Sequence, residues 1–262
     1  MAERLDKALV AAGLVPSRSR AHHLIENGQV TVGGVVVHKP ATKVQPGQKL
    51  SITEQDQWVS RAAHKLLGAL QAFGQIQPAG LRCLDAGAST GGFTQVLLSR
   101  GAEHVVAVDV GRDQLAAQVR ADPRVTAVEG LNLRYVRPGE LGEPFGLIVA
   151  DLSFISLRLV VGALAGQAAP GADLLLMVKP QFEIGRQRLA RTGVVSSPAQ
   201  RREAVVGVIA AAEDAGLALR GVSRSQLPGQ DGNAEFFLWL RSEPAAAISA
   251  TEDRLGSVEF GG

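Results

Sequence analysis

Residues 81–94 have the sequence LRCLDAGASTGGFT, and this segment limits the possible fold more than any other part of the chain. An apolar run ends in the carboxylate of Asp85 and passes into a loop of small residues. The apolar residues that follow, Phe93, Val96 and Leu97, have the spacing of a helix that packs on a sheet. This order of strand, small-residue loop and helix is typical of a nucleotide-type cofactor site at the carboxyl end of a strand.

The residues of the loop limit which kinds of cofactor it could bind. A dinucleotide fingerprint needs a second glycine where this chain has Ser89. A phosphate-binding P-loop has the spacing of Gly87 and Gly92, but it needs a lysine where Phe93 precedes Thr94. Both phosphate interpretations are therefore weakened. The loop fits an adenosine-bearing ligand that carries no phosphate.

A second strand end supports this interpretation. Residues 104–109 read as a buried parallel strand that ends in Asp109, about 20 residues beyond the loop, where a carboxylate reaches ribose hydroxyls. Together these segments describe the core of a methyltransferase that uses S-adenosylmethionine (SAM). An ordinary strand–helix–strand unit with a solvated Asp109 remains the alternative.

Strands and helices alternate from residue 81 onward, which predicts an α/β fold with a doubly wound, Rossmann-like sheet and helices on both faces. The expected strands are 81–85, 104–109, 124–128, 146–150, 173–178, 217–224 and 235–240, and the expected helices include 94–100, 113–121, 157–166 and 199–215. The length of 262 residues allows one large domain and a small one.

Composition excludes several classes of protein. The single cysteine, Cys83, lies in an expected buried strand, which indicates a reducing compartment, and we expect a cytoplasmic protein. The chain has no run of 18 apolar residues and no apolar core near residue 1, so neither a membrane span nor a signal peptide is expected. The sequence shows no cluster of His and Cys ligands, and no metal is expected.

Positive charge is concentrated before the division expected near residue 55. Residues 1–50 hold seven Lys and Arg against three Asp and Glu, a difference of +4, whereas the whole chain has a net charge of +2. Charge alone favours a solvated helix face over phosphate binding. The order of helix pair, Gly-Gly hairpin and further strand, with the motifs RLD (4–6), SRSRA (17–21) and KP (39–40), resembles the S4 RNA-binding domain. That resemblance implies contacts with folded RNA, which we assign to Arg4, Arg18, Arg20, Lys39, Lys43 and Arg61.

Two more strand ends carry charged residues. Residues 147–151 place Asp151 at the end of the fourth strand, and residues 174–179 place Lys179 at the end of the fifth. In an open α/β sheet these ends face the same crevice as Gly87 and Asp109. A lysine that ends a buried strand is costly unless it is paired or functional. A purely structural Asp151–Lys179 ion pair remains the alternative.

At this point the chain resembles the TlyA family, in which an S4 domain is fused to an FtsJ-like RNA 2′-O-methyltransferase. The motifs that carry the resemblance are WVSRAAHKL (58–66), DAGASTGGFT (85–94), DLSFISL (151–157), VKPQFEIG (178–185) and GNAEFF (232–237). The resemblance implies a catalytic tetrad of Lys65, Asp151, Lys179 and Glu235. It implies a SAM site at Asp85, Gly87, Ala88, Ser89, Thr90, Gly91, Phe93, Thr94, Asp109 and Asn132.

The same resemblance implies the domain organisation and the substrate. The S4-like domain would span residues 1–54, the linker 55–60, the methyltransferase domain 61–242, and a flexible tail 243–262. The implied substrate is cytidine in bacterial ribosomal RNA, in the 16S RNA, the 23S RNA or both, so ribosomal subunits are the expected partners. Asp56 departs from the family, whose linker often has an arginine at this position, and this places a linker role in coupling SAM binding to the S4 domain in doubt.

The tetrad also suits the chemistry. A ribose 2′-hydroxyl is a poor nucleophile, so the enzyme must align it with the methyl group and weaken its hold on the proton. A lysine serves as a base only when a neighbouring cation and desolvation favour its neutral form. We therefore expect Lys65 to lie beside Lys179, and Asp151 and Glu235 to hold the two lysines in register.

Two other classes of function are alternatives to an active methyltransferase. An RNA-binding module with an inactive methyltransferase fold would be favoured by loss of the tetrad or of Asp109, all of which are present. A cytolysin is the second, because the family has also been named hemolysin. A pore-forming protein needs a spanning segment or a barrel hairpin, and the longest apolar run of this chain is short and interrupted.

Overall fold

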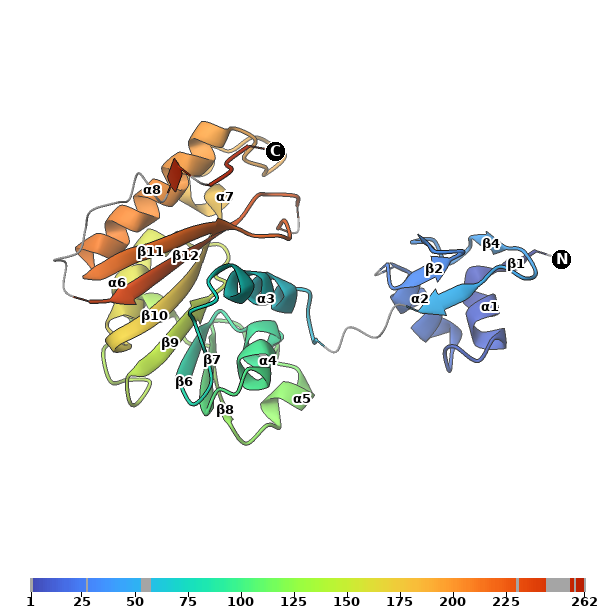
Figure 1. The fold of residues 1–262 in the computed structure, drawn as a ribbon, viewed down its shortest axis with the longest axis horizontal. Helices are drawn as coiled ribbons and strands as arrows, with labels where there is room; N and C mark the ends of the chain where they lie inside the picture. The colour runs from blue at the N-terminus through green and yellow to red at the C-terminus, as the bar shows by residue number, and fades with distance from the viewer. Residues whose placement is uncertain are drawn as a thin grey trace. The chain divides into compact units, whose positions relative to one another are not determined.

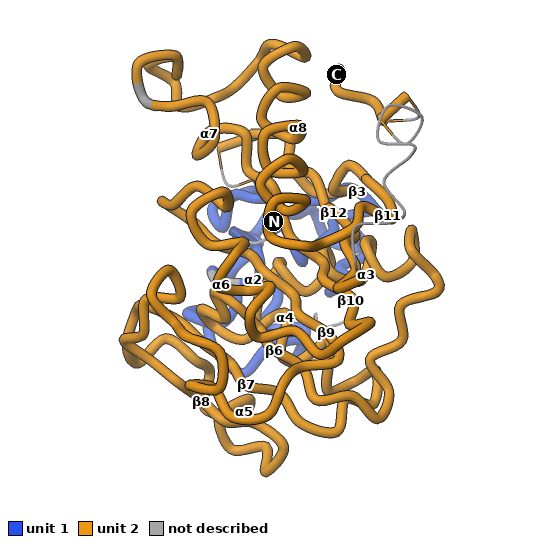
Figure 2. The backbone as a smooth tube through the Cα atoms, turned by 90° about the vertical axis from the view of Figure 1, so that its left-hand side faces the viewer, with its two compact units in different colours: residues 1–57 blue, residues 58–262 orange. Residues whose placement is uncertain are grey.

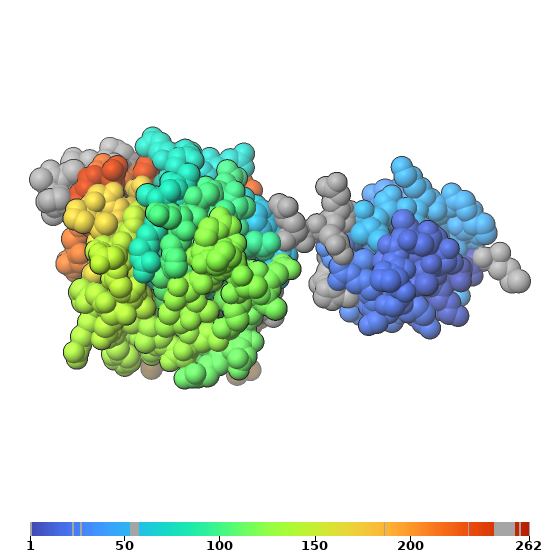
Figure 3. Space-filling view, turned by 90° about the horizontal axis from the view of Figure 1, so that it is seen from below, coloured from blue at the N-terminus to red at the C-terminus, as the bar shows by residue number. Residues whose placement is uncertain are grey.

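The computed structural model describes residues 2–26, 28–52, 58–229, 231–243, 255–256 and 258–261. The chain divides into two compact units, Met1–Gln57 and Trp58–Gly262, which are coloured separately in Figure 2. In the space-filling view of Figure 3 the first unit is blue, and the second runs from cyan to red. The expected linker spans this division. Asp56 lies outside the described residues, and residues 58–60 belong to the second unit.

The first unit pairs two helices with short strands. Helices α1 (Leu5–Ala11) and α2 (Arg18–Glu26) are followed by a hairpin of β2 (Val30–Val32) and β3 (Val35–Val36). Gly33 and Gly34 both have positive φ, as a tight hairpin turn requires. Strand β5 (Leu50–Ile52) pairs with β2, and β1 (Glu3–Arg4) pairs with β4 (Lys43–Val44).

Apolar residues at helical spacing form the core of the first unit. Leu5 and Leu9 of α1 are fully buried, and so are Ala21 and Ile25 of α2. Residues four apart lie on one face of a helix, so each helix turns one apolar face inward. The unit therefore has its own core, as the sequence predicted for a small N-terminal domain.

The second unit is built on a seven-stranded sheet with the order β11-β12-β10-β9-β6-β7-β8 (Figure 1). The strands are β6 (Arg82–Ala86), β7 (His104–Asp109), β8 (Val125–Glu129), β9 (Phe145–Ala150), β10 (Ala168–Val178), β11 (Leu217–Arg224) and β12 (Phe236–Ser242). Strand β12 runs antiparallel to both of its neighbours, and the pairs among β10, β9, β6, β7 and β8 are parallel. The predicted α/β fold is confirmed.

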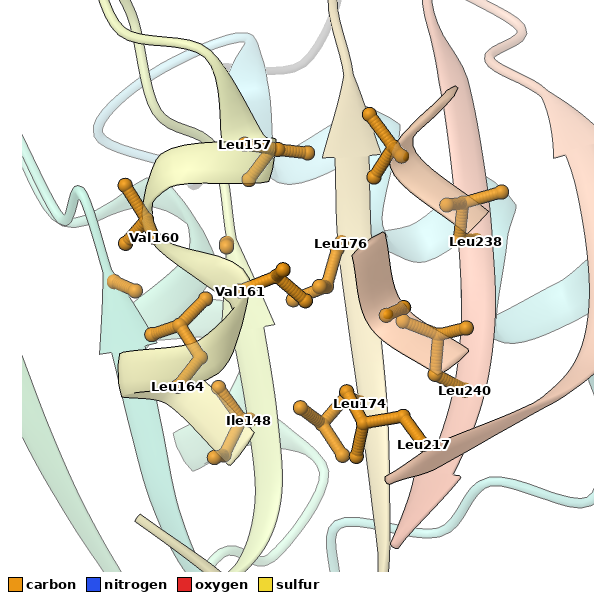
Figure 4. Close-up of a cluster of buried hydrophobic side chains, with 14 of the residues drawn as sticks. Ile148, Leu157, Val160, Val161, Leu164, Leu174, Leu176, Leu217, Leu238 and Leu240 are labelled. Carbon is orange, nitrogen blue, oxygen red and sulfur yellow. The ribbon is translucent and has the colours of Figure 1, made fainter. Parts of the chain in front are cut away.

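Helices cover both faces of this sheet (Figure 1). Helices α3 (Ala62–Ala72) and α4 (Gly92–Ser99) pack on one face, and α5 (Ala117–Arg120) packs near β7. Helices α6 (Val161–Ala165) and α8 (Pro198–Asp214) pack on the other face. Figure 4 shows part of that second core, where Val161 and Leu164 of α6 face Leu174 and Leu176 of β10.

Several element bounds differ from those predicted. The expected helix 113–121 is reduced to α5, and the expected helix 157–166 begins as a 3-10 turn, Leu157–Leu159, before α6. Strand β10 begins at Ala168, earlier than predicted, with an irregularity in its pairing between Ala168 and Asp173. Within the described residues, none of the helices combines the length and the hydropathy that a membrane span requires.

The C-terminal segment does not match the expected flexible tail where the structure describes it. Leu255 is buried in the same core as α8 and β12, and Val258 and Phe260 pack against that core. The ring of Phe260 lies 5.1 Å from the ring of Phe236. Arg201 of α8 donates a hydrogen bond to the carbonyl of Phe260 at 2.9 Å. Polar, small-residue composition predicted a loose tail, and the three apolar residues near the end outweigh it.

Candidate active site

The candidate site lies where the strand order of the sheet reverses. Strand β6 has β7 on one side and β9 on the other, so the chain leaves β6 in one direction and later returns on its opposite side. The loops after β6 and β9 therefore diverge and open a crevice at their carboxyl ends. Gly87 follows β6 with φ of 88°, and a Cβ there would lie 2.8 Å from the carbonyl oxygen of Asp151. Only glycine allows these two backbones to approach so closely.

The third strand end of the crevice belongs to β7. Both carboxylate oxygens of Asp109 accept backbone hydrogen bonds, from Ser89 N–H at 2.8 Å and from Gly111 N–H at 2.7 Å. Ser89 has a positive φ of 47°, a conformation that turns its N–H toward Asp109. A carboxylate oxygen accepts more than one hydrogen bond, so Asp109 retains acceptor capacity for ligand hydroxyls.

A pocket of about 520 Å³ opens beside Asp109. Four of the predicted cofactor residues line it: Gly87, Ser89, Asp109 and Asn132. Its other walls come from the loops after β7, β8 and β9, including Gln114, Leu131, Leu133, Leu152, Phe154 and Ile155. None of these wall residues was predicted: Leu152, Phe154 and Ile155 stand in the DLSFISL motif, where only Asp151 was given a role, and the loop residues Gln114, Leu131 and Leu133 carry no signal in a single sequence.

A smaller pocket of about 160 Å³ shares Gly87, Ser89, Asp151 and Ser153 with the larger one. Its remaining lining includes the predicted Ala88, Thr90, Phe93 and Lys179, together with Ser60, Ala62 and Gly92. Ser60 was not predicted as a site residue, although it stands in the WVSR motif before α3. Because the two pockets have four residues in common, they form one site with two compartments.

Three predicted cofactor residues line neither pocket. Asp85 is fully buried, and it accepts a hydrogen bond from Thr94 Oγ1 at 2.6 Å. Burial raises the pKa of Asp85 to about 7. Gly91 lies against Leu115 and Val119, below the loop. Asp85, Gly91 and Thr94 have no surface in the two described pockets, and their part in cofactor binding stays a prediction.

The four predicted catalytic residues form two ion pairs. Lys179 Nζ lies 2.6 Å from Asp151 Oδ1, a contact of ion-pair distance outside hydrogen-bond geometry, and it donates a hydrogen bond to Ser153 Oγ at 2.8 Å. Lys65 Nζ donates to Glu235 Oε2 at 2.5 Å. Asp151 and Lys179 line the smaller pocket, whereas Lys65 and Glu235 line neither pocket. The two lysines are therefore each matched to a carboxylate.

The sheet register explains why these residues meet. Asp151 follows the last residue of β9, and Lys179 follows the last residue of β10, which runs parallel to β9. Strand β12 is antiparallel to β10, and its first residue, Phe236, pairs with Val178. Glu235 precedes β12 and therefore lies at the edge where β10 ends. Lys65 reaches this edge from the first turns of α3.

The predicted RNA-binding residues of the first unit include a cluster around a buried carboxylate. Asp6 is fully buried and pairs with Arg4 at 3.0 Å, Arg18 at 2.7 Å and His22 at 2.9 Å. Hydrogen bonds from Arg4, and then from Arg18 and His22, hold the pKa of Asp6 well below its usual range despite burial. Asp6 and His22 were not predicted as site residues.

The other predicted RNA-binding residues are not among the partners of Asp6, although Arg20 stands between Arg18 and His22 in α2. Lys39 and Lys43 are exposed, and Arg20 is half-buried. Arg61 is exposed at the start of α3 in the second unit. The first unit thus carries most of the predicted RNA contacts, while the two pockets belong to the second unit.

Comparison with known proteins agrees with this geometry. Residues 58–242 match the FtsJ-like methyltransferase family, and residues 3–50 match the S4 domain. The solved structure of a Streptococcus thermophilus protein that carries a hemolysin name has 34% sequence identity and a TM-score of 0.73, and covers 97% of this chain and 94% of that chain. The fold and the site therefore define an FtsJ-like methyltransferase that has an N-terminal S4 domain.

Two relatives with assigned activities are similar over most of their length. The Mycobacterium tuberculosis protein named 16S/23S rRNA (cytidine-2′-O)-methyltransferase TlyA is 50% identical over 94% of this chain and 92% of the relative. The Campylobacter jejuni protein named 23S rRNA (cytidine-2′-O)-methyltransferase TlyA is 32% identical over 85% and 93%. The chain belongs to the TlyA family of FtsJ-like methyltransferases.

Proposed function

We propose that this protein transfers a methyl group from SAM to the ribose 2′-hydroxyl of cytidine in ribosomal RNA. The observation that carries the proposal is the Asp151–Lys179 pair, which lines a small pocket that opens beside a larger one at the switch point of the sheet. The names of the M. tuberculosis and C. jejuni relatives support cytidine as the target and ribosomal RNA as its source. Such a substrate places the activity in the cytoplasm, on ribosomal subunits or their precursors.

The residues of the larger pocket fit SAM. Gly87 lets the loop after β6 pass close to the backbone of Asp151, where a Cβ would not fit, and Asp109 has acceptor capacity for two ribose hydroxyls. Asn132 accepts a hydrogen bond from Arg134 N–H, and this leaves its side-chain amide available to a bound base. We assign the adenosine portion to these residues, and we assign the methionine portion to the loop residues of the smaller pocket. When bound, SAM supplies a methyl carbon attached to a positively charged sulfur.

Lys179 is the residue that we assign to the 2′-hydroxyl. A neutral amine has two N–H groups and one lone pair. One N–H bonds Ser153 Oγ, and the nitrogen lies 2.6 Å from Asp151 Oδ1, at ion-pair distance but outside hydrogen-bond geometry. The lone pair then remains to accept the hydroxyl proton as the oxygen would bond to the methyl carbon, while the bond from that carbon to sulfur would break and leave its electron pair on the sulfur. Asp151 would stabilise the resulting ammonium without moving, because it already lies at ion-pair distance.

The Lys65–Glu235 pair has a supporting part in this arrangement. Its side chains are only 7% and 2% exposed, so neither group has free access to bulk water. Glu235 borders the start of β12, next to the end of β10 from which Lys179 extends. We propose that this pair sets the electrostatic field around Lys179 and excludes water from the edge of the sheet.

Substitution of Lys179 tests the proposal. We expect both Lys179→Ala and Lys179→Arg to abolish methylation of ribosomal subunits, since guanidinium stays protonated and cannot act as a base. Transfer of labelled methyl groups from SAM measures the rate, and calorimetry measures SAM affinity, which should change little because the loss is in the transition state. Arg100→Ala, at the exposed end of α4, is the control. Near wild-type turnover by Lys179→Arg would show that only positive charge is needed.

A further inference from the structure

Glu183 is a buried carboxylate that the proposed chemistry does not use. It ends the short helix α7 (Pro180–Glu183), four residues after Lys179, which is the residue that precedes this helix. The Glu183 side chain is 1% exposed. A buried carboxylate is costly unless hydrogen bonds and an ion pair compensate for its lost hydration. The partners of Glu183 should therefore indicate which part of the structure this buried carboxylate stabilises.

Within the described residues, the hydrogen-bond and ion-pair partners of the Glu183 side chain lie in one segment, the loop that follows β9. Glu183 Oε2 accepts a hydrogen bond from Ser156 Oγ at 2.5 Å, and Oε1 accepts one from Leu157 N–H at 2.7 Å. Arg158 Nε lies 3.2 Å from Oε2, and Arg158 Nη2 donates to the Glu183 carbonyl at 2.6 Å. Glu183 thus fixes the far end of the loop that begins at Asp151.

The same loop touches the α7 segment at two further points. Lys179 Nζ bonds Ser153 Oγ at 2.8 Å, near the start of the loop. The rings of Phe154 and Phe182 lie 5.4 Å apart, near its middle. The loop and the α7 segment are therefore in contact at three successive points, through Lys179, Phe182 and Glu183.

These three contacts also explain how a strained backbone conformation is maintained at Phe154. Phe154 has φ of 65°, a left-handed conformation that is unfavourable for a bulky side chain. Such conformations persist only where the surrounding contacts determine the backbone. Glu183 supplies two of those contacts through Ser156 and the Leu157 N–H, and Lys179 supplies another through Ser153.

We propose that Glu183 is a positioning residue for methyl transfer. By holding residues 151–157 against α7, it keeps Asp151 and Ser153 at contact distance from Lys179 Nζ. It acts through Lys179 and touches neither the substrate nor the cofactor. The inference rests on the proposed function, because it assigns Glu183 a part in orienting the group that takes the hydroxyl proton.

The test compares Glu183→Ala and Glu183→Gln with Glu203→Gln as the matched control. Glu203 lies on α8, where its exposed side chain pairs with Arg188 at the surface. We expect Glu183→Ala to lower kcat by about 10- to 100-fold, because a displacement of about 1 Å in a catalytic group can cost about 100-fold. The Gln variant keeps an oxygen for the Leu157 N–H and should retain more of kcat, and Glu203→Gln should match the wild type. SAM affinity by calorimetry should change far less than kcat.

A double-mutant cycle distinguishes a positioning role of Glu183 from a general loss of folding. If Glu183 acts through the loop, then Glu183→Gln should cost little in a Ser153→Ala background, because residues that act as a unit are not additive. Fully additive losses would overturn the inference. So would wild-type kcat in both Glu183 variants, or equal losses of kcat and SAM affinity.

Lys179→Ala, measured in parallel, separates the two proposals. If Lys179→Ala is inactive while both Glu183 variants turn over normally, the positioning role is wrong and the proposed function stands. Normal turnover by Lys179→Ala would overturn the proposed function itself.

Discussion

Asp85 should make the second unit less stable as the pH rises, and Asp85→Asn should remove that effect. The carboxyl is fully buried below the glycine loop, and its Oδ1 has no hydrogen-bond partner within the described part of the chain. Burial is the main cause that raises its pKa from the ordinary 3.8 to about 7, and the charges of Asp151 and Asp109 add to it. The hydrogen bond from Thr94 acts in the opposite direction.

The sign and size of the effect follow from proton linkage. Asp85 binds its proton more tightly in the folded chain than in the unfolded chain, so the free energy of unfolding falls as the pH rises from about 4 to about 7. Each unit of pKa difference corresponds to about 1.4 kcal/mol, so the whole loss is on the order of 4 kcal/mol. Below this range the protonated group has no penalty, and above it the loss is constant.

Asparagine removes the charge and keeps an oxygen that can accept the Thr94 hydroxyl. We therefore expect Asp85→Asn to gain stability over the wild type as the pH is raised from 4 to 8. Urea unfolding followed by tryptophan fluorescence measures this unit, because both tryptophans, Trp58 and Trp239, belong to it. The control is Asp214→Asn, at an exposed position of α8.

Two results would refute this reasoning. One is a difference between Asp85→Asn and the wild type that stays constant from pH 4 to pH 8, which would mean that the carboxyl titrates alike in the folded and unfolded chains. The other is an equal gain in Asp214→Asn, which would assign the effect to net charge and not to burial.

Two further predictions concern the cofactor and the C-terminal segment. Asp109→Ala should weaken SAM binding, because each hydrogen bond left unmade costs about 1–3 kcal/mol; calorimetry that shows unchanged affinity would contradict the assignment of the ribose to Asp109. Phe260→Ala should lower the free energy of unfolding by about 1–2 kcal/mol, somewhat less than for a fully buried ring. An unchanged urea midpoint would show that the contact of Phe260 with Phe236 does not persist in solution.

The sequence predicted the parts of the site that follow strand ends. A buried parallel strand is a short apolar run, and the residue that follows it must lie at the carboxyl edge of the sheet. Asp109, Asp151 and Lys179 were placed on that edge by this local rule alone. The structure brings them together because β7, β9 and β10 all run in the same direction.

The contact between Lys65 and Glu235 could not be predicted from the local sequence pattern. Lys65 and Glu235 are 170 residues apart, and their contact depends on an antiparallel β12 that brings Glu235 to the end of β10. Nothing in the local pattern around Glu235 shows the direction of that strand. The family resemblance supplied these two residues as site members, and the register supplies the physical reason.

The contacts of Glu183 and of the C-terminal segment were not predicted from the sequence, for a related reason. Glu183 is an acidic residue in a short turn, and a single sequence cannot show that its partners lie in the loop after β9. The C-terminal segment has a composition typical of a loose tail, and its few apolar residues are informative only once the core that receives them is known. Both cases depend on contacts between segments far apart in the chain.

The charges at the edge of the sheet suggest why two domains are needed. The charged residues that line the two pockets balance, because Asp109 and Asp151 are matched in number by Arg134 and Lys179. A site with this balance has no excess of positive charge to attract the phosphates of RNA. The first unit has such an excess, with seven basic residues against three acidic ones in residues 1–50. On the proposed function, the basic first unit therefore supplies affinity for the RNA backbone that the charge-balanced site lacks.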